Sequence, residues 1–235
     1  MRLAVVAAIS IAAGFGPTAA QAGQWLTDPA SACAVWDPLP VPDQSVSWTG
    51  ECRDGKASGP GVLTISRLGR LVERNEGVFV DGKHSGHGVR VNASGRYVGD
   101  FEDGLFEGNG TYVGSDGMRY DGEWKGGNFD GQGKLSFPSG VRYEGHFRAN
   151  TFNGFGSLIL PGGGRYDGEY ELNTPHGSGI YRSADGSIYA GQWSHGCFRQ
   201  GSETAHLGVP AEDCGLSEEP SALAEAPDRR GSGGD

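Results

Sequence analysis

Residues 120–133 read Tyr-Asp-Gly-Glu-Trp-Lys-Gly-Gly-Asn-Phe-Asp-Gly-Gln-Gly. Tyr120, Gly122 and Trp124 occupy alternate positions, and the residues between them are charged. Side chains of a β-strand point to opposite faces in turn, so this alternation predicts a strand with one aromatic face and one wet face. Gly127 then supplies a residue that tolerates positive φ, as tight hairpin turns require. The stretch predicts one β-hairpin.

The same pattern recurs along the chain with a fixed period. Seven anchor glycines are separated by 27, 22, 23, 23, 23 and 23 residues: Gly50, Gly77, Gly99, Gly122, Gly145, Gly168 and Gly191. A Gly-x-Gly follows each of the first six at offsets +9 and +11, whereas the seventh copy breaks off at Gly201. One hairpin is too small to bury a core of its own, so the copies must stack.

Aromatic residues flank most of the anchor glycines at offsets −2 and +2. In the last five copies they are Tyr97, Phe101, Tyr120, Trp124, Tyr143, Phe147, Tyr166, Tyr170, Tyr189 and Trp193. One interpretation is that these rings pack against one another between adjacent hairpins. The other is that they form a groove for a peptide, a protein surface or sugar rings. We take these ten residues as the candidate binding groove. Packing between hairpins and binding of a partner can both occur in one protein.

These residues resemble the MORN repeat (membrane occupation and recognition nexus), whose pattern is roughly YEGEWxxGxxxGxGxxxxxDG. The resemblance covers residues 46–201, although the second copy has Asn75 in place of the leading Tyr and the seventh is truncated. It implies an all-β fold, an elongated single-layer antiparallel sheet or solenoid of about seven tandem β-hairpins with a concave aromatic face. It also implies a scaffold without catalytic activity.

The first 22 residues have the features of a secretory signal peptide. Arg2 provides the positive start, residues 3–15 an apolar stretch, and Ala20-Gln21-Ala22 a small-residue cleavage site. We expect cleavage before Gly23 and an exported protein of bacterial type, periplasmic or, alternatively, extracellular. The other interpretation is an uncleaved N-terminal anchor or a buried strand. No transmembrane segment is expected in the mature chain, because no later stretch has 18 consecutive apolar residues.

The four cysteines are expected to form two disulfides, as an even count in an exported chain indicates. A disulfide needs Cα atoms within about 7 Å, and an extended array keeps its ends apart. We therefore predict Cys33–Cys52 and Cys197–Cys214 as staples at the two ends. The domains are then a capping segment at 23–45, the repeat array at 46–201, and a C-terminal cap with an acidic disordered tail at 202–235.

Charge and motifs argue against several classes of function. The chain carries 19 Lys and Arg against 29 Asp and Glu, and residues 202–235 alone hold two Arg against eight acids. Such a balance does not favour nucleic acid or anionic headgroups. Neither Gly-x-Ser-x-Gly nor His-Glu-x-x-His occurs. His84 and His87 could share a metal, but we interpret them as surface turn residues.

The sequence therefore predicts a non-enzymatic scaffold with neither cofactor nor metal. It would bind a protein partner, or associate with itself, through the concave aromatic face. The alternative is a binding module for a glycan or lipid of the cell envelope.

Overall fold

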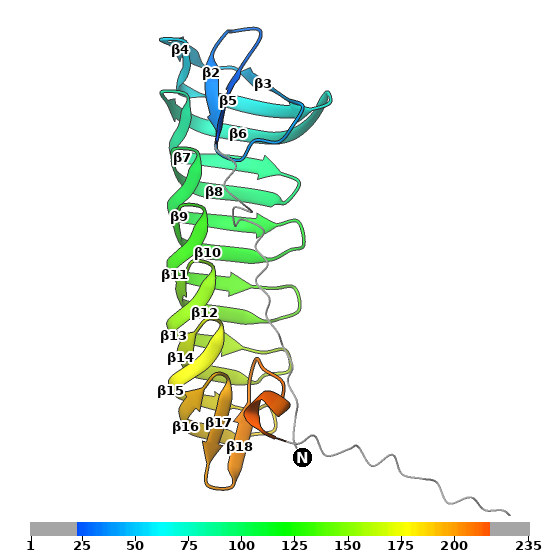
Figure 1. Cartoon of the computed structure of the whole chain (residues 1–235), viewed down its shortest axis with the longest axis vertical. Helices are drawn as coiled ribbons and strands as arrows, with labels where there is room; N and C mark the ends of the chain where they lie inside the picture. The colour runs from blue at the N-terminus through cyan, green and yellow to red at the C-terminus, as the bar shows by residue number, and fades with distance from the viewer. Residues whose placement is uncertain (1–22, 217–235) are drawn as a thin grey trace, which may run out of the picture.

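The computed structural model describes residues 23–216, so the predicted signal peptide and the tail from 217 onward lie outside the described residues. Figure 1 shows an elongated stack of hairpins whose strands cross the long axis of the molecule. The 18 strands form one open sheet. The predicted all-β fold of tandem hairpins is confirmed.

The strands become regular after an irregular start. The N-terminal strands are β1 (Gln24–Thr27), β2 (Ala34–Asp37), β3 (Gln44–Trp48), β4 (Glu51–Arg53), β5 (Lys56–Arg67) and β6 (Arg70–Val80). The repeated hairpins continue with β7 (Lys83–Asn92), β8 (Gly95–Glu102), β9 (Leu105–Gly114), β10 (Arg119–Lys125), β11 (Asn128–Ser136), β12 (Arg142–Arg148), β13 (Thr151–Ile159), β14 (Arg165–Glu171), β15 (Thr174–Arg182) and β16 (Ile188–Ser194). The C-terminal end consists of β17 (Cys197–Gln200), β18 (Glu203–His206) and a 3-10 turn, η1 (Glu212–Cys214).

From β5 onward each strand pairs antiparallel with the next, which makes a simple meander. The anchor glycines face the glycines of the neighbouring strand, as in the pair Gly122 and Gly133. At the N-terminal end β3 and β4 share the outer edge of β5. The β1–β2 hairpin joins there through a single parallel contact, Ala34 with Lys56. The outer edge of β5 is therefore paired with other strands and is not left open.

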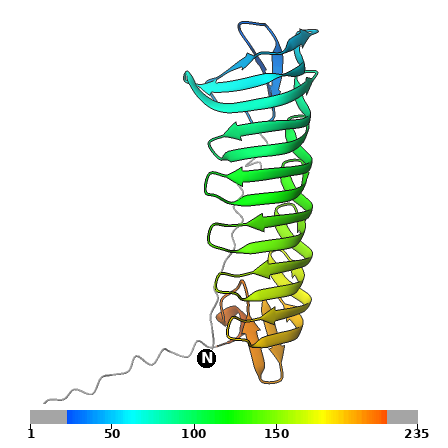
Figure 2. The same cartoon turned by 180° about the vertical axis from the view of Figure 1, so that it is seen from behind.

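The hairpin turns have the geometry that the sequence predicts. Both central residues of each turn have positive φ, in the pairs Asp54/Gly55, Asp81/Gly82, Asp103/Gly104, Gly126/Gly127, Ala149/Asn150, Leu172/Asn173 and His195/Gly196. Two positive φ values are the signature of the type I′ turn, which matches the twist of the flanking strands. Each turn is also bonded to the preceding hairpin: Asn150 N–H donates to the O of Phe129 in β11 at 3.0 Å, and the equivalent bond recurs in neighbouring units. Figure 2 shows the other edge of the stack, where loops such as the one between β9 and β10 join successive hairpins.

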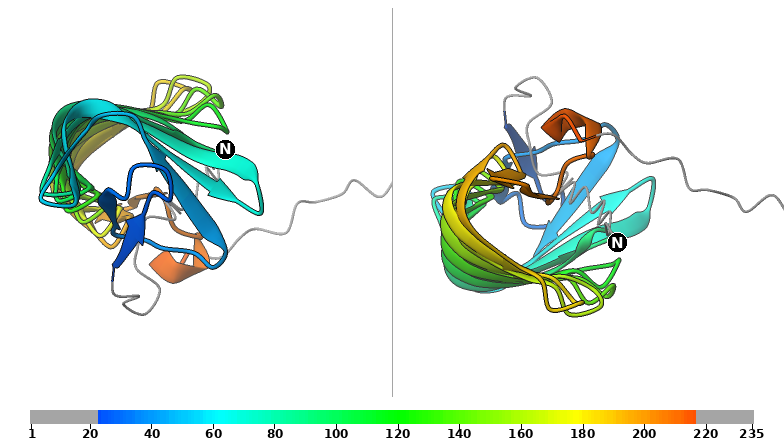
Figure 3. Two further views of the ribbon diagram at one scale, coloured as in Figure 1. Left: turned by 90° about the horizontal axis from the view of Figure 1, so that it is seen from above. Right: turned by 90° about the horizontal axis from the view of Figure 1, so that it is seen from below.

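Each hairpin is sharply bent toward its aromatic face. In the ladder Tyr120 lies opposite Leu135, while Phe129 lies opposite Trp124, several residues further along. The rings of Tyr120 and Phe129 nevertheless stack with centroids 3.8 Å apart. A register shift between Gly122 and Trp124 provides the bend, because a bulge kinks its strand. The aromatic face is therefore the inner side of the curved cross-section seen in Figure 3.

The bend explains why glycine is needed at the centre of each hairpin. A Cβ on Gly133 would lie 2.5 Å from the Cε2 atom of the Tyr120 ring, well inside van der Waals contact. The phenol ring thus lies directly against the backbone of the facing strand, where only glycine leaves room.

The outer face of the sheet carries the charged residues predicted from the alternation. Arg119 and Asp121 form an ion pair at 2.6 Å, Arg165 and Asp167 one at 2.7 Å, and Lys134 pairs with Glu144 across strands. These pairs are solvent-exposed and contribute little stability each.

Both predicted disulfides are present near the ends of the array. Cys33 and Cys52 have Cα atoms 5.6 Å apart, and Cys197 and Cys214 have theirs 5.5 Å apart. The first bond fixes the β1–β2 hairpin to β4, and the second fixes η1 to β17. Two disulfides are compatible with an exported protein.

Candidate functional site

The ten predicted groove residues form one continuous aromatic column along the inner face. Nine of them are at most 4 % exposed, and only Tyr189 is half-buried. Each ring contacts rings of its own unit or of a neighbouring unit, as Tyr120 does with Trp124 and Phe147. The packing interpretation of the column therefore agrees with the structure. Little ring surface is left for a partner, and the groove role of these residues stays a prediction.

Four of the five tyrosines at offset −2 also satisfy their hydroxyl groups inside the array. Tyr120 donates to Glu123 O at 2.8 Å and Tyr143 to His146 O at 3.0 Å, and Tyr97 and Tyr166 make the same bond in their units. Burial raises the pKa of these phenols well above the usual value. They are neutral donors that fix the bend rather than acids or bases.

The second repeat departs from this plan at three core positions. Asn75 stands at offset −2, where later units have Tyr, and His84 at +7, where several have Phe. Arg90 stands at +13, where other units have Leu or Tyr. Asn75 and His84 are nevertheless buried like the rings that they replace. A polar cluster thus interrupts the column near its N-terminal end.

Arg90 is the centre of the polar cluster. Its Nε donates to Asn75 Oδ1 at 2.6 Å and lies 3.3 Å from Glu73 Oε1, while Nη2 donates to Gly104 O at 2.9 Å. The guanidinium also lies over the rings of Phe101 and Phe106, 5.3 and 5.2 Å from their centroids. Arg90 therefore fills the space of a ring, and its Nε and Nη2 groups have partners within the protein.

Glu73 is held by the same cluster. It accepts the side-chain amides of Asn75 at 2.9 Å and Asn92 at 3.0 Å, besides its ion pair with Arg90. Four side chains from β6 and β7 are thus fixed in one network. Such a network rigidifies a core when each member has partners.

His84 lies in the column as a flat ring between Phe79 and Phe101, with centroids 4.8 and 3.7 Å away. Neither ring nitrogen has a hydrogen-bond partner among the described residues. Burial, and then the nearby charge of Arg90, lower the pKa of His84 to about 3. The interpretation of His84 as a surface turn residue is wrong, because its place at +7 points it into the core. His87 is exposed and pairs with Asp100 at 3.2 Å, and residues 23–216 contain no group of three or more metal-ligating side chains.

We expect His84→Phe to make the protein more resistant to acid. The folded state binds a proton at His84 only near pH 3, whereas the unfolded chain does so near pH 6.5, so stability falls as the pH drops through this window. Phe removes this loss and restores the ring of later repeats. Between pH 7 and pH 5 the variant should lose about 2 kcal/mol less unfolding free energy than the wild type. Urea titrations at both pH values measure this, and an equal loss in His84→Phe and the wild type would contradict the prediction.

A cavity of about 470 Å³ opens beside the polar cluster. Residues 37–41, between β2 and β3, form one wall, which we call the strap. The opposite walls come from Val72 and Glu73 of β6, Arg90 and Asn92 of β7, and Leu105 and Phe106 of β9. We call this space the strap cavity. Here the inner face is both polar and hollow.

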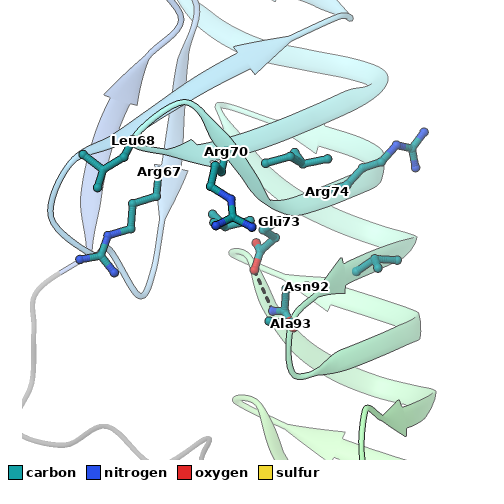
Figure 4. Close-up of a pocket in the computed structure, with 10 residues that line it drawn as sticks. Arg67, Leu68, Arg70, Glu73, Arg74, Asn92 and Ala93 are labelled. Carbon is teal, nitrogen blue, oxygen red and sulfur yellow. Dashed lines mark hydrogen bonds between the residues drawn. The ribbon is translucent and has the colours of Figure 1, made fainter.

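A second hollow, of about 700 Å³, lies on the β5–β6 hairpin, which is longer than those that follow. Figure 4 shows Arg67, Leu68, Arg70 and Arg74 along it, with Glu73 bonded to Asn92 below. Leu68 and Leu71 are 79 % and 62 % exposed. We call Arg67, Leu68, Arg70, Leu71 and Arg74 the arginine rim. The rim adjoins the strap cavity, because Val72, Glu73, Asn92 and Ala93 line both hollows.

The sequence analysis missed the polar cluster, the strap cavity and the rim. Comparing offsets −2, +7 and +13 across the copies would have shown Asn75, His84 and Arg90 as one group. Nothing local indicates that Asp37 joins them, because the strap reaches the cluster through the tertiary fold.

Stacked bent hairpins around a continuous aromatic column define an open β-solenoid of repeats. The MORN repeat family matches six segments, residues 48–66, 76–95, 97–119, 120–142, 143–165 and 166–188, which together make up more than half of the 235 residues. The chain belongs to the MORN repeat family. MORN repeats are typically non-enzymatic binding modules, and they often mediate contacts with proteins or membrane lipids.

No curated protein matches the sequence of this chain. Within residues 23–216 the structure has no helix with the length and apolar character needed to cross a bilayer.

Proposed function

We propose that this chain is an exported, non-enzymatic scaffold that binds a protein partner along its concave face. The arginine rim is the observation that carries this proposal. Two large leucines are exposed beside Arg67 and Arg70 in a chain of net charge −10. Apolar and arginine side chains together are typical of protein interfaces. The buried aromatic column keeps the array rigid, and the partner would follow the face from the rim.

Site-specific photo-cross-linking in native cell envelopes tests this function. A photoreactive residue at Leu71, on the rim, should give a protein adduct of defined mass. The same residue at Lys134, exposed on the outer face, should give none. Once the partner is isolated, Arg67→Glu with Arg70→Glu should weaken its binding at least about tenfold, a loss near 1.4 kcal/mol. Equal adducts at both positions, or an unchanged affinity, would contradict the proposal.

The second candidate is binding of an envelope glycan or lipid. Exposed Leu68 and Leu71 beside Arg67 and Arg70, which form no ion pair within residues 23–216, also suit an anionic amphiphile. Sugar stacking has less support, because nine of the ten column rings are buried. Adducts at Leu71 whose mass corresponds to lipid or glycan, without protein, would favour this function over the first.

A further inference from the structure

We propose that the strap cavity is a binding site for a primary ammonium group carried on an aliphatic chain. The site adjoins the arginine rim but includes none of the rim residues, and it does not depend on the proposed scaffold function. Its volume of about 470 Å³ lies within the range of small-ligand pockets.

The first argument is an unsatisfied carboxylate. Asp37 lines the cavity and is only 8 % exposed. Its Oδ1 accepts the Leu39 N–H at 2.9 Å, but its buried Oδ2 has no hydrogen-bond partner within residues 23–216. A buried carboxylate oxygen without a donor is costly unless a ligand provides one. Burial, and then the negative charge of Glu73, raise the pKa of Asp37, because both disfavour its ionised form.

The second argument is the sign of the charge. Asp37 and Glu73 bring two carboxylates to the cavity, and Arg90 brings one guanidinium. The guanidinium is engaged by Glu73, Asn75 and the Gly104 carbonyl. One negative charge is therefore left over, and it lies on the residue with the free oxygen. A single cation would neutralise the site, whereas an anion would not.

The third argument is shape. A guanidinium needs two acceptor atoms side by side, but only one oxygen of Asp37 is free, which suits the point charge of an ammonium group. The remaining walls are mainly aliphatic, with Pro38, Leu39, Val41, Val72 and Leu105. They would cover methylene groups, as surfaces do when a lysine stem packs on them. The ligand can be a free alkylamine or the lysine side chain of a bound protein.

Calorimetric titration of the mature protein with pentylammonium chloride tests the site, with pentanol as the neutral control of similar shape. We expect pentylammonium to bind at least about tenfold more tightly than pentanol. Asp37→Asn should abolish this preference while still accepting the Leu39 N–H. Glu102→Gln removes one negative charge from an exposed position outside the cavity and should leave it unchanged. Equal affinity for both compounds, or an unchanged preference in Asp37→Asn, would overturn the proposal.

A second readout works on the unmodified protein. The Asp37 side-chain carbon should change its NMR shift when pentylammonium is added, and binding below the pKa of Asp37 should release protons to the buffer. An unchanged Asp37 signal during saturable binding would place the amine elsewhere and overturn the assignment. Titration with N-acetyl-lysine methylamide distinguishes the sources. Binding comparable to pentylammonium indicates a protein lysine, and binding of pentylammonium alone indicates a free amine.

Discussion

Replacing Trp124 by alanine is expected to lower the free energy of unfolding by about 4 kcal/mol. The indole lies 2 % exposed at the centre of the column and contacts rings of two units, among them Tyr97, Tyr120 and Phe129. Its Nε1 donates to Gly110 O at 3.1 Å, so the change also removes this hydrogen bond from a partly buried carbonyl. The cavity would weaken the contact between neighbouring hairpins.

Urea unfolding followed by circular dichroism measures the loss. Hydrogen exchange should show it concentrated in β9–β11, because a repeat array contacts mainly its nearest neighbours. Phe155→Ala is the matched control, since this ring is 69 % exposed in the same array and its removal should change stability by less than about 0.5 kcal/mol. Similar losses in the two variants would mean that the column is not the core.

Removing the first disulfide is expected to cost about 3 kcal/mol at the N-terminal end. Cys33 and Cys52 are 19 residues apart, and their bond fixes the β1–β2 hairpin against the first repeat. Without it, hydrogen bonds still attach the hairpin to the array, among them the bond from the Trp48 N–H to the Asp28 carboxylate at 3.2 Å. In Cys33→Ala/Cys52→Ala the amides of Ala34 and Trp36, which donate to Gly55 O and Gly82 O, should exchange faster.

Cys197→Ala/Cys214→Ala is the counterpart for this experiment. It should open β17, β18 and η1 while leaving Ala34 and Trp36 protected, because the two ends of an array are separated by several interfaces. If either variant changed exchange equally at both ends, the ends would be coupled and the array would unfold as one unit.

The fold was largely predictable because the residue pattern of its hairpins repeats with a regular period. Tyr120, Gly122 and Trp124 share a face by simple alternation, and Gly127 falls where a type I′ turn needs it. The bend was not predictable, since a bulge between Gly122 and Trp124 leaves no separate mark on the sequence. In an unbent sheet the aromatic residues would form an open groove. In the bent hairpin the ring of Phe129 stacks on the ring of Tyr120 and covers it.

The polar second repeat was visible in the sequence but was treated as a degenerate end copy. Asn75, His84 and Arg90 lie 9 and 6 residues apart, and only the repeat register shows that they share one face. The strap cavity could not be predicted from the repeat register alone. Asp37 approaches Glu73 and Arg90 because β2 lies against the turn of β6 and β7, where Trp36 N–H donates to Gly82 O at 2.8 Å.

The orientation of the strands has a mechanical consequence. Because the strands cross the long axis in Figure 1, tension between the two ends would load the backbone ladders one row after another. The array would lengthen stepwise, hairpin by hairpin, at low force. Each disulfide closes a short loop near one end and leaves the five hairpins from β7 to β16 free to extend. A stretched molecule would act as an extensible spacer between whatever is attached to its two caps.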